Sequence, residues 1–256
     1  MKVNPLDLSG KHIIATGASS GIGLATSRLI CELGGHVSMV ARNEDKLRES
    51  SKGLPENRFD IFPFDLLETE KIPDLVNAIK EKKGPIGGLV HSAGNFAVTP
   101  LRSFDPVEYQ RLYDLHVTAF FMLSQAVCSK RNVDKKGVSV VAVSSILAKT
   151  GKEGASTYGS AKGALLSAVR SLAVEYAPKL IRFNCVCPGW VETPMLESIK
   201  NLHPDQNSFD KDVTHKHPLG LGDSIDVANA ICFLLSDASR WTTGTSLVLD
   251  GGYSAQ

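Results

Sequence analysis

Short apolar runs alternate with amphipathic stretches along the whole chain. The apolar runs are rich in β-branched residues and predict strands at residues 12–16, 36–41, 58–64, 86–91, 138–144, 181–186 and 247–249. The amphipathic stretches between them predict helices at residues 21–33, 44–51, 71–82, 106–130, 157–176 and 224–235. Regular alternation of strand and helix indicates an α/β fold, with a parallel sheet covered by helices on both faces.

Seven predicted strands are the number expected for one doubly wound (Rossmann) domain that takes in residues 1–256. No internal repeat or low-complexity linker divides the chain. The only long irregular stretch is predicted at residues 194–221. A loop of that length inside a compact domain is usually functional or mobile.

Charge and composition exclude several classes of protein. Lys and Arg number 28 and Asp and Glu number 27, so the strong basic excess of a nucleic-acid-binding protein is missing. No apolar run approaches the ~20 residues of a membrane span, and residues 1–10 lack the apolar core of a signal peptide. We therefore expect no nucleic-acid partner and no membrane partner.

The five cysteines are an odd number scattered through apolar segments, which favours a reducing compartment, the cytoplasm, over a disulfide framework. Cys185 and Cys187 alternate along a predicted strand without a matching Cys-x-x-Cys or His pair. His215 and His217 lie in the irregular stretch and are interpreted as solvated loop histidines. We expect no metal site.

A glycine-rich turn follows the first predicted strand and opens the first helix. Residues 16–23 read Thr-Gly-Ala-Ser-Ser-Gly-Ile-Gly. Gly17 permits a tight exit from the strand, Gly21 lets the backbone approach a pyrophosphate, and Gly23 lets the helix pack close to the sheet. The unpaired N–H groups of the helix N-terminus attract phosphate. The turn therefore predicts a dinucleotide site.

Tyr158 and Lys162 are four residues apart on a predicted helix, so their side chains lie on one face. A nearby ammonium is expected to lower the pKa of a tyrosine, which is near ~10 in free solution. Ser145 follows the preceding strand, at the edge of the sheet where doubly wound proteins form their sites. Ser144 points to the opposite face by strand alternation. These residues predict an acid–base centre.

The spacing Gly-x-x-x-Gly-x-Gly resembles the short-chain dehydrogenase/reductase family, and the resemblance continues in order along nearly the whole chain. The further matches are Asp65, which resembles the family's adenine-contacting Asp, His91-Ser92-Ala93-Gly94, Ser145 with Tyr158 and Lys162, Pro188-Gly189-Trp190-Val191-Glu192-Thr193, Thr243-Gly244, and Asp250-Gly251-Gly252. His91 and Ser92 stand where the family has an architectural Asn pair.

The resemblance implies an oxidoreductase that moves a hydride between NAD(P)(H) and a small carbonyl or secondary alcohol substrate. Tyr158 would exchange the proton with the substrate oxygen, Ser145 would hydrogen-bond that oxygen, and Lys162 would tune Tyr158 and bind the nicotinamide ribose. The implied cofactor-binding residues are Gly17, Ser19, Ser20, Gly21, Ile22, Gly23, Arg42, Asp65, Leu66, Ala93, Gly94, Tyr158, Lys162, Pro188, Gly189, Val191 and Thr193.

In layout the chain resembles 3-oxoacyl-acyl-carrier-protein reductases, but sugar, polyol and steroid enzymes of the family share that layout. These enzymes differ in the stretch at residues 194–221, which we expect to be the substrate-specificity loop. The physiological substrate is therefore not identified by the sequence.

The second predicted strand ends Val40-Ala41-Arg42. An NAD enzyme would place an acidic residue near Ala41 to accept hydrogen bonds from the ribose hydroxyls, whereas the guanidinium of Arg42 suits a 2′-phosphate. We expect NADP(H) to be preferred over NAD(H).

His116 occupies the position of the family's fourth catalytic residue, an Asn that supports a water chain to the active-site lysine. Either His116 takes over that proton relay, or it is a helix residue with local hydrogen bonds and no catalytic part. The second alternative leaves room for a cofactor-binding regulatory or scaffold protein with vestigial activity. A nucleotide-sugar epimerase on the related extended fold is disfavoured by the glycine spacing.

The helices predicted at residues 106–130 and 157–176 carry apolar residues around much of their circumference, namely Phe120, Phe121, Met122, Ala164, Leu165, Leu166 and Val169. A helix that covers a sheet needs only one apolar stripe. The family uses these two helices in a four-helix interface. We expect a homotetramer, or a dimer, built through them.

Overall fold

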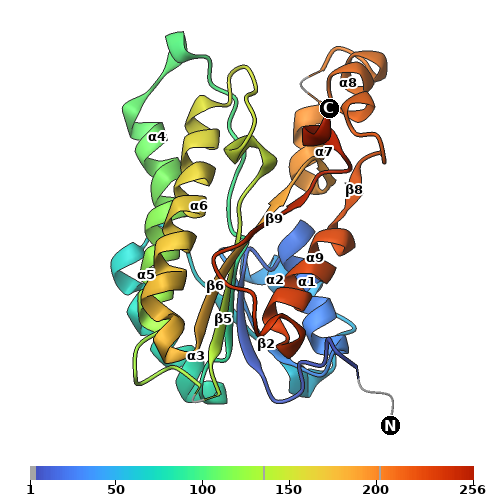
Figure 1. The fold of residues 1–256 in the computed structure, drawn as a ribbon. Coiled ribbons are helices and arrows are strands. Elements are labelled where there is room, and N and C mark those ends of the chain that lie inside the picture. Colours follow the sequence, from blue (N-terminus) through green and yellow to red (C-terminus); the bar gives the residue numbers. More distant parts are fainter. Residues whose placement is uncertain (1–3, 135, 202) are drawn as a thin grey trace.

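The computed structural model describes residues 4–134, 136–201 and 203–256. Seven parallel strands form one sheet, in the order β3-β2-β1-β4-β5-β6-β9 (Figure 1). Their bounds are β1 (His12–Thr16), β2 (His36–Ala41), β3 (Phe59–Pro63), β4 (Gly88–His91), β5 (Val138–Val143), β6 (Ile181–Pro188) and β9 (Ser246–Leu249). The prediction of a seven-stranded, doubly wound α/β fold is confirmed. The strand order reverses between β1 and β4, where such sheets bind their ligands.

Helices cover both faces of the sheet (Figure 1). One face carries α1 (Gly21–Glu32), α2 (Glu44–Ser50) and α9 (Ser224–Leu235), and the other carries α3 (Ile72–Lys83), α4 (Pro106–Tyr113), α5 (Ala119–Val127) and α6 (Ser156–Tyr176). Ile30 and Ile231 belong to the core under the first group, and Phe120 and Leu165 to the core under the second. Each fully buried side chain of this size stabilises the fold by roughly 1.5–3 kcal/mol.

The prediction of a single helix at residues 106–130 is wrong in two respects. A π-helical turn, Asp114–Thr118, separates α4 from α5, and α5 ends at Val127. The side-chain amide of Asn132 donates to the Ala126 carbonyl at 2.9 Å and so satisfies one of the carbonyls that the helix end leaves free. A π turn inserts one residue into the helix and frequently occurs at functional sites. Apolar periodicity does not reveal such an insertion.

The stretch at residues 194–221 is not irregular, as the sequence analysis expected. It contains α7 (Pro194–Lys200), α8 (Gln206–Asp212) and a 3₁₀ turn at Thr214–Lys216. The Thr193 hydroxyl accepts from the Leu196 N–H, and the Asp205 carboxylate accepts from the Ser208 N–H. These caps and the proline at the first position of α7 are helix-start signals that were present in the sequence. Two short strands, β7 (Val191–Glu192) and β8 (Gly222–Asp223), pair at the base of the segment.

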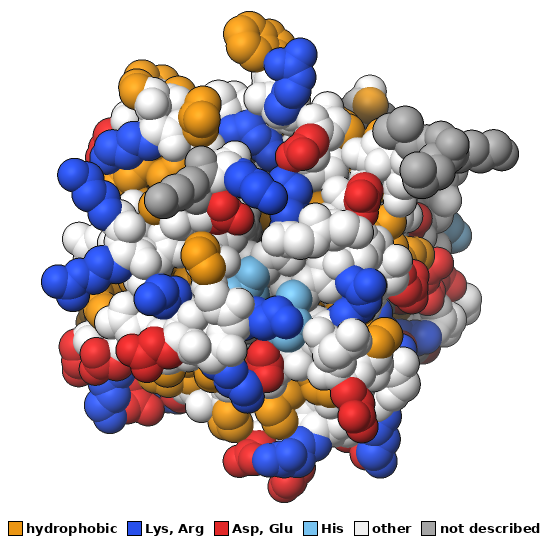
Figure 2. All heavy atoms as spheres, turned by 90° about the horizontal axis from the view of Figure 1, so that it is seen from below, with side chains coloured by type: hydrophobic (Ala, Val, Ile, Leu, Met, Phe, Trp, Pro, Cys, Tyr) orange, Lys and Arg blue, Asp and Glu red, His pale blue; other side chains and the backbone are white. Residues whose placement is uncertain are grey.

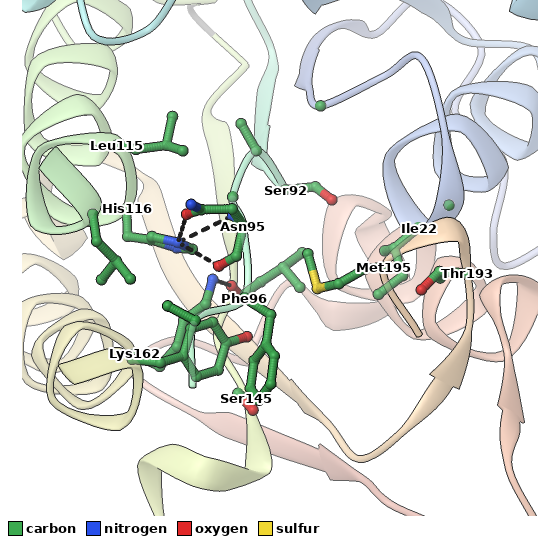
Figure 3. Close-up of a pocket in the computed structure, with 18 of the residues that line it drawn as sticks. Ile22, Ser92, Asn95, Phe96, Leu115, His116, Ser145, Lys162, Thr193 and Met195 are labelled. Carbon is green, nitrogen blue, oxygen red and sulfur yellow. Dashed lines mark hydrogen bonds between the residues drawn. The ribbon is translucent and has the colours of Figure 1, made fainter. Parts of the chain in front are cut away.

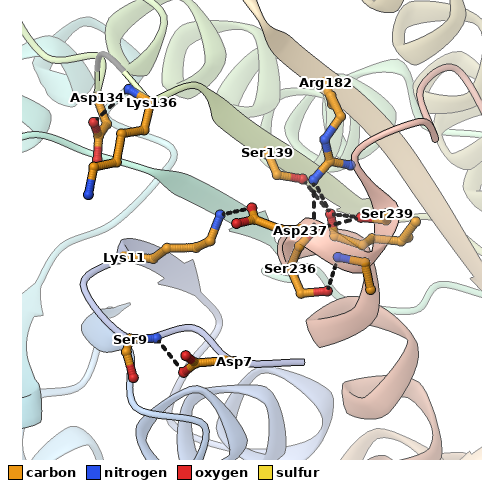
Figure 4. Close-up of polar contacts among 12 residues, drawn as sticks. Asp7, Ser9, Lys11, Asp134, Lys136, Ser139, Arg182, Ser236, Asp237 and Ser239 are labelled. Carbon is orange, nitrogen blue, oxygen red and sulfur yellow. Dashed lines mark hydrogen bonds and ion pairs between the residues drawn. The ribbon is translucent and has the colours of Figure 1, made fainter. Parts of the chain in front are cut away.

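The amino ends of the strands surround a second, smaller hollow, seen from below in Figure 2, where histidine side chains lie among Lys and Arg. His12 contacts the Ser38 hydroxyl at 2.9 Å, and His36 forms an ion pair with Asp60 at 2.9 Å. Lys11 pairs with Asp237 at 2.7 Å close by (Figure 4). Three of the polar side chains that line this hollow, Lys11, His12 and His36, are therefore paired with groups next to it.

Arg182 joins the sheet to the end of α9 at the same side of the molecule. Its guanidinium donates to the Leu234 carbonyl at 2.8 Å and to the Ser236 carbonyl at 3.3 Å (Figure 4). In the part of the chain that the structure describes, no helix is both long and apolar enough to span a bilayer.

Candidate active site

The carboxyl ends of the strands surround a cavity of about 960 Å³. All of the cofactor-binding and catalytic residues expected from the sequence, except Gly23, line it: Gly17, Ser19, Ser20, Gly21, Ile22, Arg42, Asp65, Leu66, Ala93, Gly94, His116, Ser145, Tyr158, Lys162, Pro188, Gly189, Val191 and Thr193. The structure therefore brings together at one edge of the sheet residues that are up to 176 positions apart in the chain (Gly17 to Thr193).

The glycine turn at residues 17–23 forms one end of this cavity. Gly17 and Gly21 have φ angles of +66° and +52°, which L side chains rarely adopt. A Cβ on Gly23 would lie 2.3 Å from the Gly17 carbonyl oxygen, so Gly23 acts behind the cavity wall, where α1 packs on the turn. The first turn of α1 holds no acidic residue and has no side-chain cap. Its N–H groups are available to an anion, and this turn fits a dinucleotide pyrophosphate.

The carboxyl end of β2 adds positive charge beside the turn. Arg42 is exposed and lines the cavity, as do Asn43 and Lys46 from the start of α2. Lys46 matches no motif in the sequence and was not among the residues predicted to bind the cofactor. Glu44 is committed to an ion pair with Arg48, four residues on. Among the described residues, the part of the cavity lining that comes from the end of β2 and the start of α2 therefore carries two cations and no carboxylate.

Ser145, Tyr158 and Lys162 lie together at the other end of the cavity. Lys162 Nζ lies 5.6 Å from the centre of the Tyr158 ring and donates to the Val143 carbonyl at 2.9 Å. The Ser144 hydroxyl donates to the Lys162 carbonyl at 2.8 Å, so the Ser144 side chain connects the end of β5 to the backbone of α6. Of the two adjacent serines, Ser145 is therefore the one whose hydroxyl is not committed to the α6 backbone.

Burial dominates the ionisation of this centre. It raises the pKa of Tyr158 to about 12, and the Ser145 hydroxyl opposes part of that rise. It lowers the pKa of Lys162 to about 7. The expectation that Lys162 lowers the pKa of Tyr158 is not met in this structure, because desolvation of the phenolate outweighs the other influences on Tyr158.

His116 lies in the π turn, almost fully buried, and faces the segment that follows β4. Its Nε2 is 3.0 Å from the Asn95 carbonyl oxygen and 3.3 Å from the Asn95 nitrogen, and its Nδ1 has no hydrogen-bond partner among the described residues (Figure 3). A Cβ on Gly94 would lie 2.3 Å from His116 Cε1, so the ring packs against a glycine backbone. Burial first, and then Lys162 and His91, hold the pKa of His116 well below its ordinary value.

His91 occupies an architectural position, as expected. Its Nδ1 is 3.3 Å from the Thr16 hydroxyl, and its Nε2 is 3.1 Å from the His116 carbonyl oxygen. Burial, together with the charge of Lys162, lowers its pKa to about 3, so it is neutral at physiological pH. It must then donate one hydrogen bond and accept the other, and it joins β1, β4 and the π turn.

Several lining residues were not identified from the sequence. Phe96 lies beside Ser145, and Met195 extends toward Phe96 from the side of Ile22 and Thr193 (Figure 3). Trp190 lines the cavity from the turn after β6. Trp190 and Met195 fall inside segments that the sequence predicts to matter, 188–193 and 194–221, but neither residue was predicted by itself to line the site. A lone aromatic residue after a glycine turn carries no periodic signal, and only the fold places it near Tyr158.

His217 is buried, which corrects its interpretation as a solvated loop histidine. Its Nδ1 is 2.8 Å from the Val213 carbonyl oxygen, and its Nε2 accepts a hydrogen bond from the Trp190 N–H at 3.3 Å. His215 is exposed. No group of three or more His, Cys, Asp or Glu side chains among the described residues is arranged to hold a metal ion.

Comparisons with known proteins agree with this arrangement. The family model described as enoyl-(acyl carrier protein) reductase matches residues 17–254. A 3-oxoacyl-acyl-carrier-protein reductase from Rickettsia bellii is 31% identical over 248 residues, which cover 96% of this chain and 98% of that protein. The cis-4-hydroxycyclohexanecarboxylate dehydrogenase of Sinomonas cyclohexanicum is 32% identical over 250 residues, which cover 94% and 96% of the two chains.

A solved structure has nearly the same fold. The crystal structure of a putative short-chain alcohol dehydrogenase from Sinorhizobium meliloti 1021 superposes with a TM-score of 0.91 at 30% sequence identity, over 99% of this chain and 100% of that one.

Proposed function

This chain belongs to the short-chain dehydrogenase/reductase family, and we propose that it reduces a small carbonyl compound, or oxidises the matching secondary alcohol, with NADP(H) and with Tyr158 as the acid–base residue. One observation carries the proposal. Ser145, Tyr158 and Lys162 converge at one end of a cavity whose other end is the glycine turn before α1. The nicotinamide cofactor would supply or accept the hydride when bound.

The ionisation of Tyr158 suits reduction. With a pKa of about 12, its hydroxyl is protonated at neutral pH and has a proton to give to a carbonyl oxygen that gains a hydride on carbon. The Ser145 hydroxyl would hydrogen-bond the same oxygen and hold the carbonyl in place. Lys162 would bind the nicotinamide ribose hydroxyls and help to stabilise the phenolate that remains after proton transfer.

The residues expected to bind the cofactor fit a dinucleotide. The glycine turn leaves space for the pyrophosphate because Gly17 and Gly21 have no side chains. A Cβ on Gly17 would lie 3.0 Å from the Ala93 backbone, and one on Gly21 would lie 3.1 Å from Thr193, so a side chain at either position would narrow that space. Arg42 and Lys46 together favour the 2′-phosphate of NADP(H) over the ribose hydroxyl of NAD(H). Asp65, at the carboxyl end of β3, is proposed to contact the adenine.

His116 is proposed to support the site as a neutral hydrogen-bonding residue. Its Nε2 contacts Asn95, and its buried Nδ1 has no partner in the part of the chain that the structure describes, so one nitrogen remains for a relay through water. Whether the ring takes part in that relay or only in packing is decided by a pH profile, which is described in the Discussion.

The whole chain is proposed to act as one NAD(P)-binding domain, because its single seven-stranded sheet draws strands from residue 12 to residue 249. The segment 194–221 is proposed to determine substrate specificity, since α7 contributes Met195 and Leu196 to the cavity wall. Five free cysteines support the proposal of a reducing compartment, the cytoplasm.

Turnover tests the proposal directly. The purified protein should consume NADPH when it is supplied with a panel of cyclic, linear and sugar-derived carbonyl compounds, and should reduce NADP⁺ with the matching alcohols. Cofactor binding without turnover of any member of the panel would favour the alternative, a cofactor-binding regulatory or scaffold protein with vestigial activity.

A further inference from the structure

Three aromatic rings run in series from the acid–base centre along the cavity. The Phe96 ring lies 4.9 Å from the Tyr158 ring at an interplanar angle of 72°, and the Trp190 ring lies 5.5 Å from the Phe96 ring at 73°. Both pairs have the edge-to-face geometry that aromatic quadrupoles favour. A substrate whose oxygen contacts Tyr158 and Ser145 therefore lies against Phe96 and points toward Trp190.

The backbone on either side of Phe96 is fixed by hydrogen bonds. Before it, Asn95 is hydrogen-bonded to the His116 ring (Figure 3), and after it the Thr99 N–H donates to the Gly154 carbonyl at 2.7 Å. Its own side chain packs on the cluster of Ile146, Leu147, Ala155 and Tyr158. Phe96 is therefore part of the fixed wall of the cavity.

The Trp190 ring is held as well. Its backbone N–H donates to His217 Nε2 at 3.3 Å, and its side chain packs on the small cluster that contains Leu196 and Phe209. The ammonium of Lys152 lies 5.6 Å from the centre of the indole and makes a cation–π contact. Trp190 thus connects the α7–α8 segment to the wall that Phe96 forms.

We propose that Phe96 and Trp190 are specificity-determining residues, and that they select carbonyl substrates built on a compact, rigid ring over open-chain substrates of the same size. The inference rests on the proposed function and refines its substrate class. The series of fixed aromatic rings offers flat apolar surfaces close to the reacting oxygen, with apolar neighbours such as Met195 and Leu147 completing the wall. Nothing in the family match or in the names of the relatives assigns this role to either residue.

A rigid ring suits this wall for an entropic reason. A flexible chain must give up several rotatable bonds to lie along fixed aromatic surfaces, at a cost of roughly 0.5–1.5 kcal/mol for each immobilised group with many rotamers. A ring has already lost that freedom, and its apolar faces keep the dispersion contacts. The discrimination is therefore expected mainly in substrate affinity.

The kinetic test compares cyclohexanone with its open-chain counterpart of equal carbon number, hexan-2-one, at saturating NADPH. The wild-type kcat/KM should be about tenfold higher for cyclohexanone than for hexan-2-one. A good aromatic contact contributes up to about 1.5 kcal/mol, which corresponds to a factor of about ten in affinity. Phe96→Ala and Trp190→Ala should remove most of this preference by raising KM for cyclohexanone, while Phe96→Tyr should retain it. Trp241→Ala is the matched control, because Trp241 is 92% exposed and does not line the cavity.

A binding measurement separates this inference from the proposed function. The chain has two tryptophans, so Trp190 is the only one left in Trp241→Phe. With NADP⁺ bound, which cannot reduce a ketone, cyclohexanone should change the Trp190 fluorescence at lower concentration than hexan-2-one, even if no turnover is ever found. Equal affinities for the two ketones, or a ring preference that survives both alanine substitutions, would overturn the assignment.

Discussion

The side-chain nitrogen of Lys162 lies 5.6 Å from the centre of the Tyr158 ring and donates its hydrogen bond to the backbone of β5. The two side chains share one face of α6, as their spacing of four residues requires. Both are buried, and burial disfavours the charged form of each group. The pKa of the Tyr158 phenol is therefore raised to about 12, and that of the Lys162 amine is lowered to about 7.

Tyr158→Phe should fold and bind NADPH but lose turnover by about 10²–10⁴-fold, which is the usual contribution of general acid catalysis. The substitution removes only the hydroxyl and keeps the ring contact with Phe96. Steady-state kinetics and NADPH titration measure the two effects separately. Tyr176→Phe, which lies outside the cavity, is the control, and near wild-type turnover in Tyr158→Phe would rule out the proposed role.

Lys162→Met should change how stability depends on pH in the cofactor-free protein. The folded pKa of about 7 lies below the unfolded value of ~10.4, so between these values only the unfolded chain holds the extra proton, and the wild-type free energy of unfolding rises with pH. The slope from one such proton approaches ~1.4 kcal/mol per pH unit. The variant lacks this rise.

Urea titrations of wild type and Lys162→Met from pH 7 to about 8 measure the difference. That range ends below the ordinary cysteine pKa of ~8.5, and the buried thiols contribute equally to both proteins. Parallel stability curves would mean that Lys162 is not desolvated as its burial indicates.

Arg42→Ala should raise KM for NADPH by about fivefold, which corresponds to ~1 kcal/mol, the upper end for an exposed ion pair. Because Arg42 is proposed to contact only the 2′-phosphate, KM for NADH should stay nearly constant. Arg42→Glu should go further and favour NADH, since its carboxylate repels the phosphate and can accept from ribose hydroxyls. Kinetics with both cofactors decide this, with exposed Lys52→Ala as the control. A wild-type enzyme with lower KM for NADH than for NADPH would contradict the assignment.

His116→Asn should stay active and should alter only the acid side of the pH profile. Burial first, and then the charge of Lys162 and the neighbouring His91, disfavour a protonated His116, so its pKa is held well below ~6.5 and the ring is neutral over the working range. Turnover at saturating cofactor should therefore coincide for the two proteins near neutral pH. If His116 belongs to the relay, the wild type loses activity at lower pH and the variant lacks that limb.

Profiles that superimpose at every pH would remove His116 from the mechanism and leave it as a packing residue. A wild-type limb centred near pH 6.5 that disappears in His116→Asn would instead contradict the depressed pKa. Melting temperatures of both proteins across the same range serve as the control for unfolding at acid pH.

Self-association is expected through α4, α5 and α6, as a homotetramer or a dimer. Phe120, Leu165 and Val169, on which the expectation partly rested, lie in the core of the chain itself and cannot meet a partner. Phe121 on α5, which the expectation named, is 44% exposed, and Val107 on α4 is 71% exposed, so both apolar side chains are open to a partner. Light scattering should show an oligomer at micromolar concentration.

Val107→Asp with Phe121→Asp should shift the protein toward the monomer, because the contact would bury unpaired carboxylates. Leu219→Asp, at a residue that is 87% exposed in the 194–221 segment, is the matched control and should leave the oligomer intact. A wild-type monomer would refute the expectation.

The sequence alone predicted the seven-stranded sheet and most of the helices between its strands, but not the π turn between α4 and α5 or the helices α7 and α8. Strand–helix alternation depends on local periodicity, and Gly17, Ser145 and Tyr158 follow or precede particular strands. In a parallel doubly wound sheet those positions must meet at one edge. The residues that the family resemblance implied at this edge could therefore be named without coordinates.

Only the tertiary structure decided what surrounds those residues. The π turn that carries His116, the burial that raises the pKa of Tyr158, and the packing of Phe96 on that ring all depend on segments distant in sequence. Periodicity records which face of an element is buried, but it does not record which neighbour covers that face. Desolvation and ring geometry are properties of those neighbours, and for this reason the chemistry of the site required the fold.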